Sequence, residues 1–260
     1  MSETSASAGT FLFRPRSWRR VLRFAGFATV AAISPSTYNQ QARELAVRQV
    51  YYTAWQILPG YALVAALLSL LLIEVVSVTA RKYGIERFSL ELVLSVLVLE
   101  VVPLATALLV ALRSGAAIGA EIALMSVRGE LEDKEESGNP LQDELVPRIA
   151  GAALGVASLT TVGCAIATWL AYTVFYGFNS FGVAEFSRLV VNVFDGPELG
   201  LFGLKCLLFG LAVAIIPAAT ALEAERDVLH SLPAVVLAGL LKLLLAIVVI
   251  EATTLVVKYV

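Results

Sequence analysis

Five long apolar stretches dominate this chain and restrict it to a helical fold embedded in a membrane. They cover residues 57–80, 88–112, 149–177, 199–222 and 233–257. A helix needs about 20 apolar residues to cross the hydrocarbon of a bilayer, and each stretch provides them. Of the 260 residues, 58% are hydrophobic and 15% are charged, whereas a soluble domain usually carries about 25% charged residues. The sequence therefore predicts an all-α polytopic membrane protein with five transmembrane helices.

The charges between these stretches predict how the chain is oriented. We expect one membrane domain over 57–260, preceded by an N-terminal arm with interfacial helices over 1–56. Arginines and lysines are concentrated in the arm and between the second and third stretches. Because positively charged loops stay in the cytoplasm, the N-terminus is expected there and the C-terminus outside. Segment 126–147 is then cytoplasmic, and segment 178–198 lies on the outer face, where the pattern of 183–194 predicts a short amphipathic helix.

Residues 14–33 have the pattern of an amphipathic helix that lies in the membrane interface. Arg16, Arg19, Arg20 and Arg23 fall within one arc of the helical wheel, and apolar residues fill most of the rest. A basic face of this kind suits lipid headgroups. The alternative is a twin-arginine signal peptide, which the Arg pair and the apolar residues after it imitate.

Charged residues inside the apolar stretches are costly and usually mark a pathway or a partner. They are Glu74, Glu91, Glu100, Lys205, Lys242 and Glu251. Glu74 and Glu91 lie near the ends of their stretches, which favours snorkelling to the interface, and Lys242 has the long stem that snorkelling requires. The other three lie deeper, so they must meet each other, water or a substrate.

The sequence contains no motif of an enzyme. No P-loop, HExxH zinc motif or GxSxG nucleophile is present. His230 is the single histidine, and Cys164 and Cys206 are separated by a full stretch, which makes a His/Cys metal site improbable. We expect no catalytic residue, no metal and no cofactor in this chain. The absence of a basic block argues against nucleic acid as a partner.

A series of short motifs lies between residues 99 and 151. It contains Glu100, Pro103, Arg113, Gly115, Ala120, Glu121, Ile122, Met125, Glu130, Leu131, Pro140, Pro147 and Arg148. Their order resembles the MlaE/YrbE family, whose pattern is approximately RELGP, GRxGSAxxAEIGxM, an EQ-containing helix ending in VDP, and a PR pair. Segment 47–51, VRQVY, also resembles the VRQxY that precedes the first span of the family.

This resemblance implies a permease subunit of an ATP-driven phospholipid transporter in the bacterial inner membrane. In the family, a cytoplasmic ABC ATPase binds ATP and Mg²⁺, an MCE-domain lipid-binding protein attaches on the outer side, and lipid passes between two permease copies. The resemblance makes three charged residues candidates for the lining of that cavity: Glu100, Lys205 and Glu251. It places the ATPase-coupling segment at Arg128, Glu130, Leu131, Glu132, Asp133, Glu135 and Glu136. Structural roles are implied for Pro103, Arg113, Gly115, Glu121, Pro147 and Arg148.

Several features leave alternatives open. The three candidate cavity residues could instead form a buried ion pair that fixes helix packing. Leu99 replaces the arginine that precedes the acid of the family, which removes a built-in ion-pair partner of Glu100. The coupling segment is unusually acidic, so the chain is a divergent homodimeric member or one half of a heterodimer. The motifs at Gly115-x-x-x-Gly119 and Gly151-x-x-x-Gly155 permit close helix contacts within one chain or between copies. The alternative function is a stand-alone secondary transporter or channel, against which the lack of an internal repeat argues.

Overall fold

The computed structural model describes residues 26, 40–127, 145–177, 182–222 and 232–259, and every element within them is a helix. Five helical segments are long and apolar enough to cross a membrane, namely Leu58–Tyr83, Phe88–Met125, Val146–Tyr176, Gly196–Leu222 and Pro233–Lys258. The five-span, all-α prediction is therefore confirmed. The predicted interfacial helix at 14–33 lies outside the described residues except for Gly26, as does most of the coupling segment 126–147.

Four of the spans are single α-helices, and the second is a composite. The single helices are α4 (Leu58–Tyr83), α9 (Val146–Tyr176), α11 (Gly196–Leu222) and α12 (Leu232–Tyr259). The second span consists of α5 (Glu86–Leu92), the π-helix η3 (Val93–Val101), α6 (Val102–Val110), the π-helix η4 (Ala111–Gly115) and α7 (Ala116–Val127). The shorter elements outside the spans are α3 (Gln40–Val50), the π-helix η2 (Tyr51–Trp55) and α10 (Val183–Val193).

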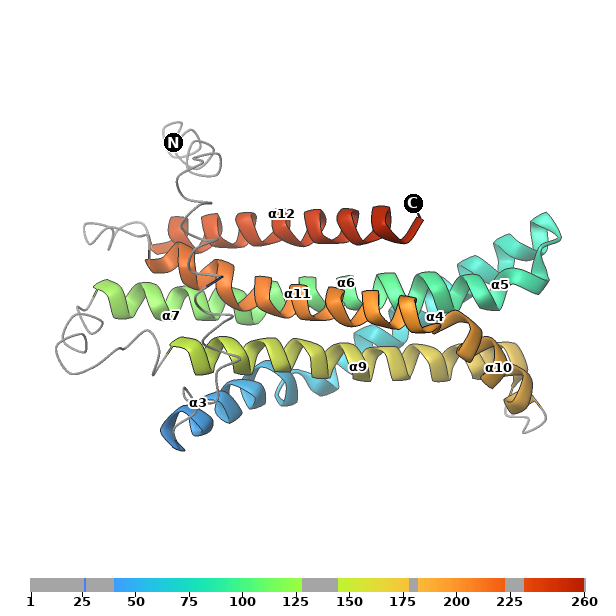
Figure 1. Cartoon of the computed structure of the whole chain (residues 1–260), viewed down its shortest axis with the longest axis horizontal. Coiled ribbons are helices and arrows are strands. Elements are labelled where there is room, and N and C mark those ends of the chain that lie inside the picture. Colours follow the sequence, from blue (N-terminus) through green and yellow to red (C-terminus); the bar gives the residue numbers. More distant parts are fainter. Residues whose placement is uncertain (1–25, 27–39, 128–144, 178–181, 223–231, 260) are drawn as a thin grey trace.

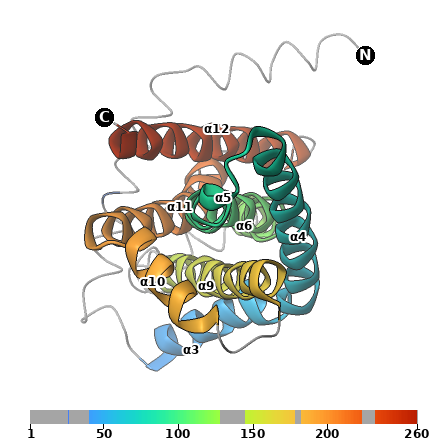
Figure 2. The same cartoon turned by 90° about the vertical axis from the view of Figure 1, so that its right-hand side faces the viewer.

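The spans alternate in direction along the long axis of the molecule. Figure 1 shows α3, the end of α7 and the start of α9 at one end, hereafter the α3 end. The α4–α5 turn, α10 and the C-terminus lie at the other end, hereafter the α10 end. The view along the bundle in Figure 2 shows the second span between α4, α9, α11 and α12. A larger share of the second span is buried than of any other span, so it forms the centre of the bundle.

The turn between the first two spans depends on one glycine. Helix α4 ends at Gly84, which has a φ of 69° and caps the helix through backbone hydrogen bonds to Ala80 and Arg81. A left-handed conformation of this kind carries no steric cost for glycine. The chain then reverses directly into α5.

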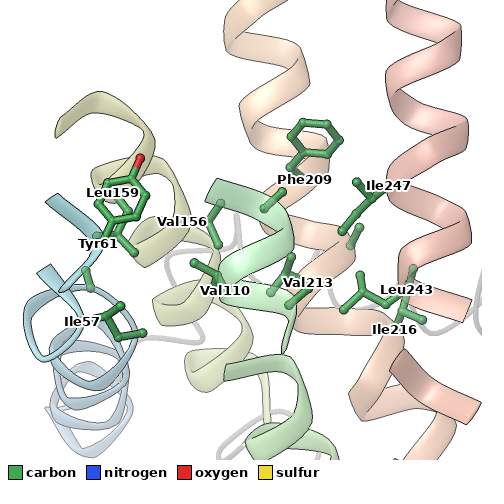
Figure 3. Close-up of a cluster of buried hydrophobic side chains, with 14 of the residues drawn as sticks. Ile57, Tyr61, Val110, Val156, Leu159, Phe209, Val213, Ile216, Leu243 and Ile247 are labelled. Atoms are coloured by element: carbon green, nitrogen blue, oxygen red, sulfur yellow. The ribbon is translucent and has the colours of Figure 1, made fainter. Parts of the chain in front are cut away.

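The main core lies where these spans meet. Figure 3 shows Tyr61 of α4, Val156 and Leu159 of α9, and Phe209 of α11 in one cluster of buried side chains. Between apolar helices in lipid, tight packing rather than the hydrophobic effect supplies most of the attraction. Core contacts such as these hold the bundle together because their side chains are in van der Waals contact on all sides.

Small residues let the helices approach each other within the chain. A Cβ added at Gly151 would lie 2.4 Å from the backbone oxygen of Ala46, and one at Gly155 would lie 2.8 Å from Cβ of Thr53. A Cβ added at Gly115 would lie 3.2 Å from Leu243. Packing inside one chain therefore accounts for both small-residue motifs, and neither one requires a second copy.

Helix α9 is longer than one crossing requires, as the uninterrupted apolar stretch predicted. Its 31 residues span about 46 Å at 1.5 Å per residue, against about 30 Å for the hydrocarbon core. At its α10 end it is followed by α10, the short helix that the pattern of 183–194 predicted. Aromatic side chains of α9 and α10 meet there, with Phe186 packed edge-on against the rings of Tyr172 and Tyr176.

Candidate functional site

Three helices bring four charged side chains together inside the bundle. Glu100 comes from η3, Lys205 from α11, and Glu251 and Lys258 from α12. The three deep charges singled out from the sequence are therefore neighbours, although Glu100 and Lys205 are 105 residues apart along the chain and Lys205 and Glu251 are 46 apart. We call these four residues the charged cluster.

Lys205 is the centre of the charged cluster. Its side chain is 2% exposed, and its ammonium group donates hydrogen bonds to Glu100 and to Glu251, the latter over 2.9 Å between Nζ and Oε1. Lys258 lies at the edge, with its Nζ 3.2 Å from Oε1 of Glu100. The ion pairs therefore run in a row of alternating sign, in the order Glu251, Lys205, Glu100 and Lys258.

The alternation of charge explains how the row can exist within a span. A single charge placed in the bilayer centre raises the free energy of the protein. A buried charge without a partner destabilises the fold more than a neutral group at the same position. Here the two carboxylates compensate the buried ammonium of Lys205, while their own side chains are 13% exposed. The geometry satisfies the requirement that deep charges meet each other.

A π-helix next to a proline positions Glu100. In η3 the N–H of Val102 bonds to the carbonyl of Leu97, five residues earlier. In this register the carbonyl of Val98 would pair with residue 103, which is Pro103 and has no N–H. The thiol of Cys164 on α9 donates to this carbonyl instead, over 3.4 Å. This hydrogen bond connects the second and third spans.

Lys258 is a member of the charged cluster that sequence reasoning missed. It lies seven residues after Glu251 and so on the same face of α12. The same spacing relates Glu198 to Lys205 on α11. Glu198 lies beside the cluster, and its Oε2 is buried without a hydrogen-bond partner among the described residues. Helical spacing was the signal that could have found both residues.

The space between these side chains is small in the single chain. A cavity of about 10 Å³ lies between Glu100, Glu198, Lys205, Thr254 and Lys258. A cavity needs roughly 10–15 Å³ to hold one water molecule. A larger ligand could reach the charged cluster only from its edge, where the side chain of Lys258 is 10% exposed.

The other charges in the spans lie apart from this cluster. Glu74 on α4 and Glu91 on α5 are exposed, as expected for residues near span ends. Lys242 is fully buried in α12, so the snorkelling that its long stem permits is not what the structure shows. Its helical face turns toward the core, because Leu243 and Ile247 beside it are also fully buried.

A second ion pair joins two of the sequence motifs at the α3 end. Nη1 of Arg148, in the first turn of α9, lies 2.7 Å from Oε1 of Glu121 on α7. Pro147 occupies the first turn of α9, where its missing N–H costs nothing. Pro103 is buried at the start of α6, and Gly115 is buried in η4, whereas Arg113 is exposed. The seven candidate coupling residues, from Arg128 to Glu136, lie outside the described residues.

Comparison with known proteins agrees with the order of these motifs. A family model described as Permease MlaE matches residues 46–257, which is well over half of the chain. No curated protein matches the sequence. The matched range contains the first four spans, the fifth except for its last residue, and every residue of the charged cluster except Lys258.

Proposed function

The chain belongs to the MlaE permease family, and from this premise we propose that it carries a phospholipid across a bacterial inner membrane between two permease copies. The family makes it a multi-pass lipid-transport subunit of an ABC transporter, a component that is not itself the ATPase. We further propose that an MCE-domain protein on the outer side exchanges lipid with this subunit. The partner ATPase supplies the bound ATP and Mg²⁺.

The observation that carries the proposal is the charged cluster itself. Helix packing could be achieved with apolar residues, because replacing a buried ion pair by neutral groups is often harmless to stability. Four charges on three spans are more than packing needs. Both glutamates and Lys258 remain 10–13% exposed at the edge of the cluster. A phosphate group arriving there would find an ammonium, and an amine would find a carboxylate.

A transport assay separates the functional role from a structural one. We expect the triple variant E100Q/K205M/E251Q to fold, because it removes both ion pairs of Lys205 together and leaves only Lys258, whose long side chain in the last turn of α12 can extend to the interface. Its lipid transfer between reconstituted vesicles, normalised to folded transporter, should fall well below that of the wild type. Glu74→Gln is the matched control, since Glu74 is exposed on α4. Full transport by the triple variant would leave helix packing as the role of the cluster.

We also propose that segment 126–137 forms a cytoplasmic helix that docks on the ATPase. Its neighbours support a coupling role, because Glu121 and Arg148 tie the helices before and after segment 128–144 to each other. Both helices also contribute to one buried apolar cluster, which contains Ile122 and Ile149. A displacement of the segment by the ATPase would therefore be transmitted to the second and third spans together.

Reversal of the four acidic residues between 132 and 136 to lysine tests this coupling. We expect the variant to insert but to lose the stimulation of ATP hydrolysis by lipid, because an acidic surface should meet a basic one on the ATPase. Glu185→Lys on α10, at the opposite end of the bundle, is the control. Normal stimulation in the fourfold variant would contradict the docking proposal. Transport without any copurifying ATPase would instead favour a stand-alone transporter.

A further inference from the structure

A second site lies at the α10 end, on the other side of η3 from the charged cluster. It is a groove of about 470 Å³ between α9, α10 and η3. This volume is within the range of small-molecule sites. Its wall includes Val98, Cys164, Ala165, Trp169 and Phe186.

The inner wall of the groove presents apolar surface, because the polar groups of Cys164 and Thr168 are already bonded. The hydroxyl of Thr168 donates to the carbonyl of Cys164 over 2.7 Å, and the thiol of Cys164 donates to Val98 over 3.4 Å. A polar headgroup would lose its hydration there and gain no partner from these groups. An alkyl chain has no hydration to lose there, and it makes van der Waals contacts with the groove wall on several sides.

Aromatic packing fixes the position of α10 against α9 beside the groove. The ring of Phe186 lies edge-on to Tyr172, with centroids 5.1 Å apart, and edge-on to Tyr176 at 6.1 Å. These three rings act as spacers between α9 and α10. The two helices could come closer only if the ring contacts broke, and such contacts contribute about 0.5–1.5 kcal/mol each beyond their buried area.

The position of the groove identifies what fills it. Its α9 wall belongs to a membrane span, and at its rim Trp169 is 58% exposed and Val183 is 51% exposed. The groove is thus continuous with the lipid-facing surface of the protein. Trp and Tyr gather at the boundary between headgroups and hydrocarbon, so Trp169, Tyr172 and Tyr176 place that boundary near the α10 end.

We propose that this groove binds one acyl chain of a membrane lipid, with the headgroup at the α10 end and the chain running inward toward Val98. The site recognises an alkyl chain and is indifferent to the headgroup. It is separate from the charged cluster, because Val98 lines the groove while Glu100, two residues later, lines the cluster. The proposal does not depend on transport, so the two can fail independently.

Photo-crosslinking to the assembled transporter in nanodiscs tests the site directly. The probe is a phosphatidylcholine with a diazirine on one acyl chain, and the labelled residues are mapped by mass spectrometry. We expect label to concentrate on the groove wall, above the level at Leu154, which is 60% exposed on the same helix and lies outside the groove. A phosphatidylglycerol probe with the same chains should give the same pattern. Label spread evenly over exposed residues, or a pattern that changes with the headgroup, would overturn the proposal.

A pair of tryptophan variants completes the test. Ala165→Trp fills the groove and should abolish the enrichment of label, together with one retained lipid per chain in native mass spectrometry. Leu154→Trp adds a ring to the same lipid-facing helix and should leave both readouts unchanged. Retention of the enrichment in Ala165→Trp would refute the site. So would a crosslink showing that a helix of a partner chain occupies the groove in the assembled transporter.

Discussion

Replacement of Lys205 by methionine should destabilise the protein far more than the loss of one surface charge. The methionine fills a similar volume, but Glu251 then loses the cation that it contacts among the described residues, while Glu100 retains Lys258 at 3.2 Å. Breaking a buried pair from one side costs about 3–5 kcal/mol. For a chain of this size, that corresponds to a decrease in Tm of roughly 6–20 °C. Tryptophan fluorescence during heating of the purified protein in detergent measures it.

A second substitution shows whether the loss comes from the orphaned carboxylate. In K205M/E251Q the buried negative charge is removed as well, so most of the lost stability should return. Lys82→Met, at an exposed position in the last turn of α4, should change stability by no more than about 0.5 kcal/mol. A wild-type Tm for Lys205→Met, or a double variant less stable than the single one, would refute the ion-pair argument.

Two further predictions concern packing and the α3 end. Gly163→Ala should lower Tm, because the new Cβ would lie 2.0 Å from the hydroxyl of Tyr61. Gly203→Ala is the control, and it should be neutral or slightly stabilising because no atom lies within 4 Å of its new Cβ. Equal changes in Tm for the two variants would contradict the packing account. Glu121→Gln should cost less than about 1 kcal/mol, because its side chain is 53% exposed and such pairs are weak. This cost should shrink in high salt as screening increases, and a large, salt-independent loss of Tm would show that the pair with Arg148 is stronger than its exposure suggests.

The number and type of the spans could be predicted because membrane insertion imposes a simple rule on sequence. About 20 apolar residues are needed for each crossing, and the ends of α4, α9 and α11 fall within a few residues of the apolar boundaries. The second apolar stretch ends at residue 112, before Arg113, whereas the helix continues to Val127. An arginine near the end of a span can extend toward the interface without ending the helix.

The charged cluster could be predicted only in part. The cost of intramembrane charge identified Glu100, Lys205 and Glu251, but it did not say which of them would meet. The replacement at Leu99 suggested that Glu100 had lost a partner, whereas the structure gives it two ammonium groups from other spans. Those partners depend on how α11 and α12 pack against η3, and a linear pattern contains no information on such tertiary contacts. The π register of η3 was likewise invisible, because propensities do not distinguish it from an α-helix.

The alternating order of the four ion-paired groups also determines how far their influence extends. Opposite charges in a row cancel at a distance, so their combined potential decays much faster than that of a lone lysine. The row therefore gives little electrostatic steering to lipids that diffuse in the bilayer. If lipid passes here, as proposed above, a headgroup would arrive by lateral diffusion and exchange partners at contact range, displacing Lys258 from Glu100 or Glu100 from Lys205. Discrimination between headgroups would then appear in how long a lipid stays rather than in how quickly it arrives.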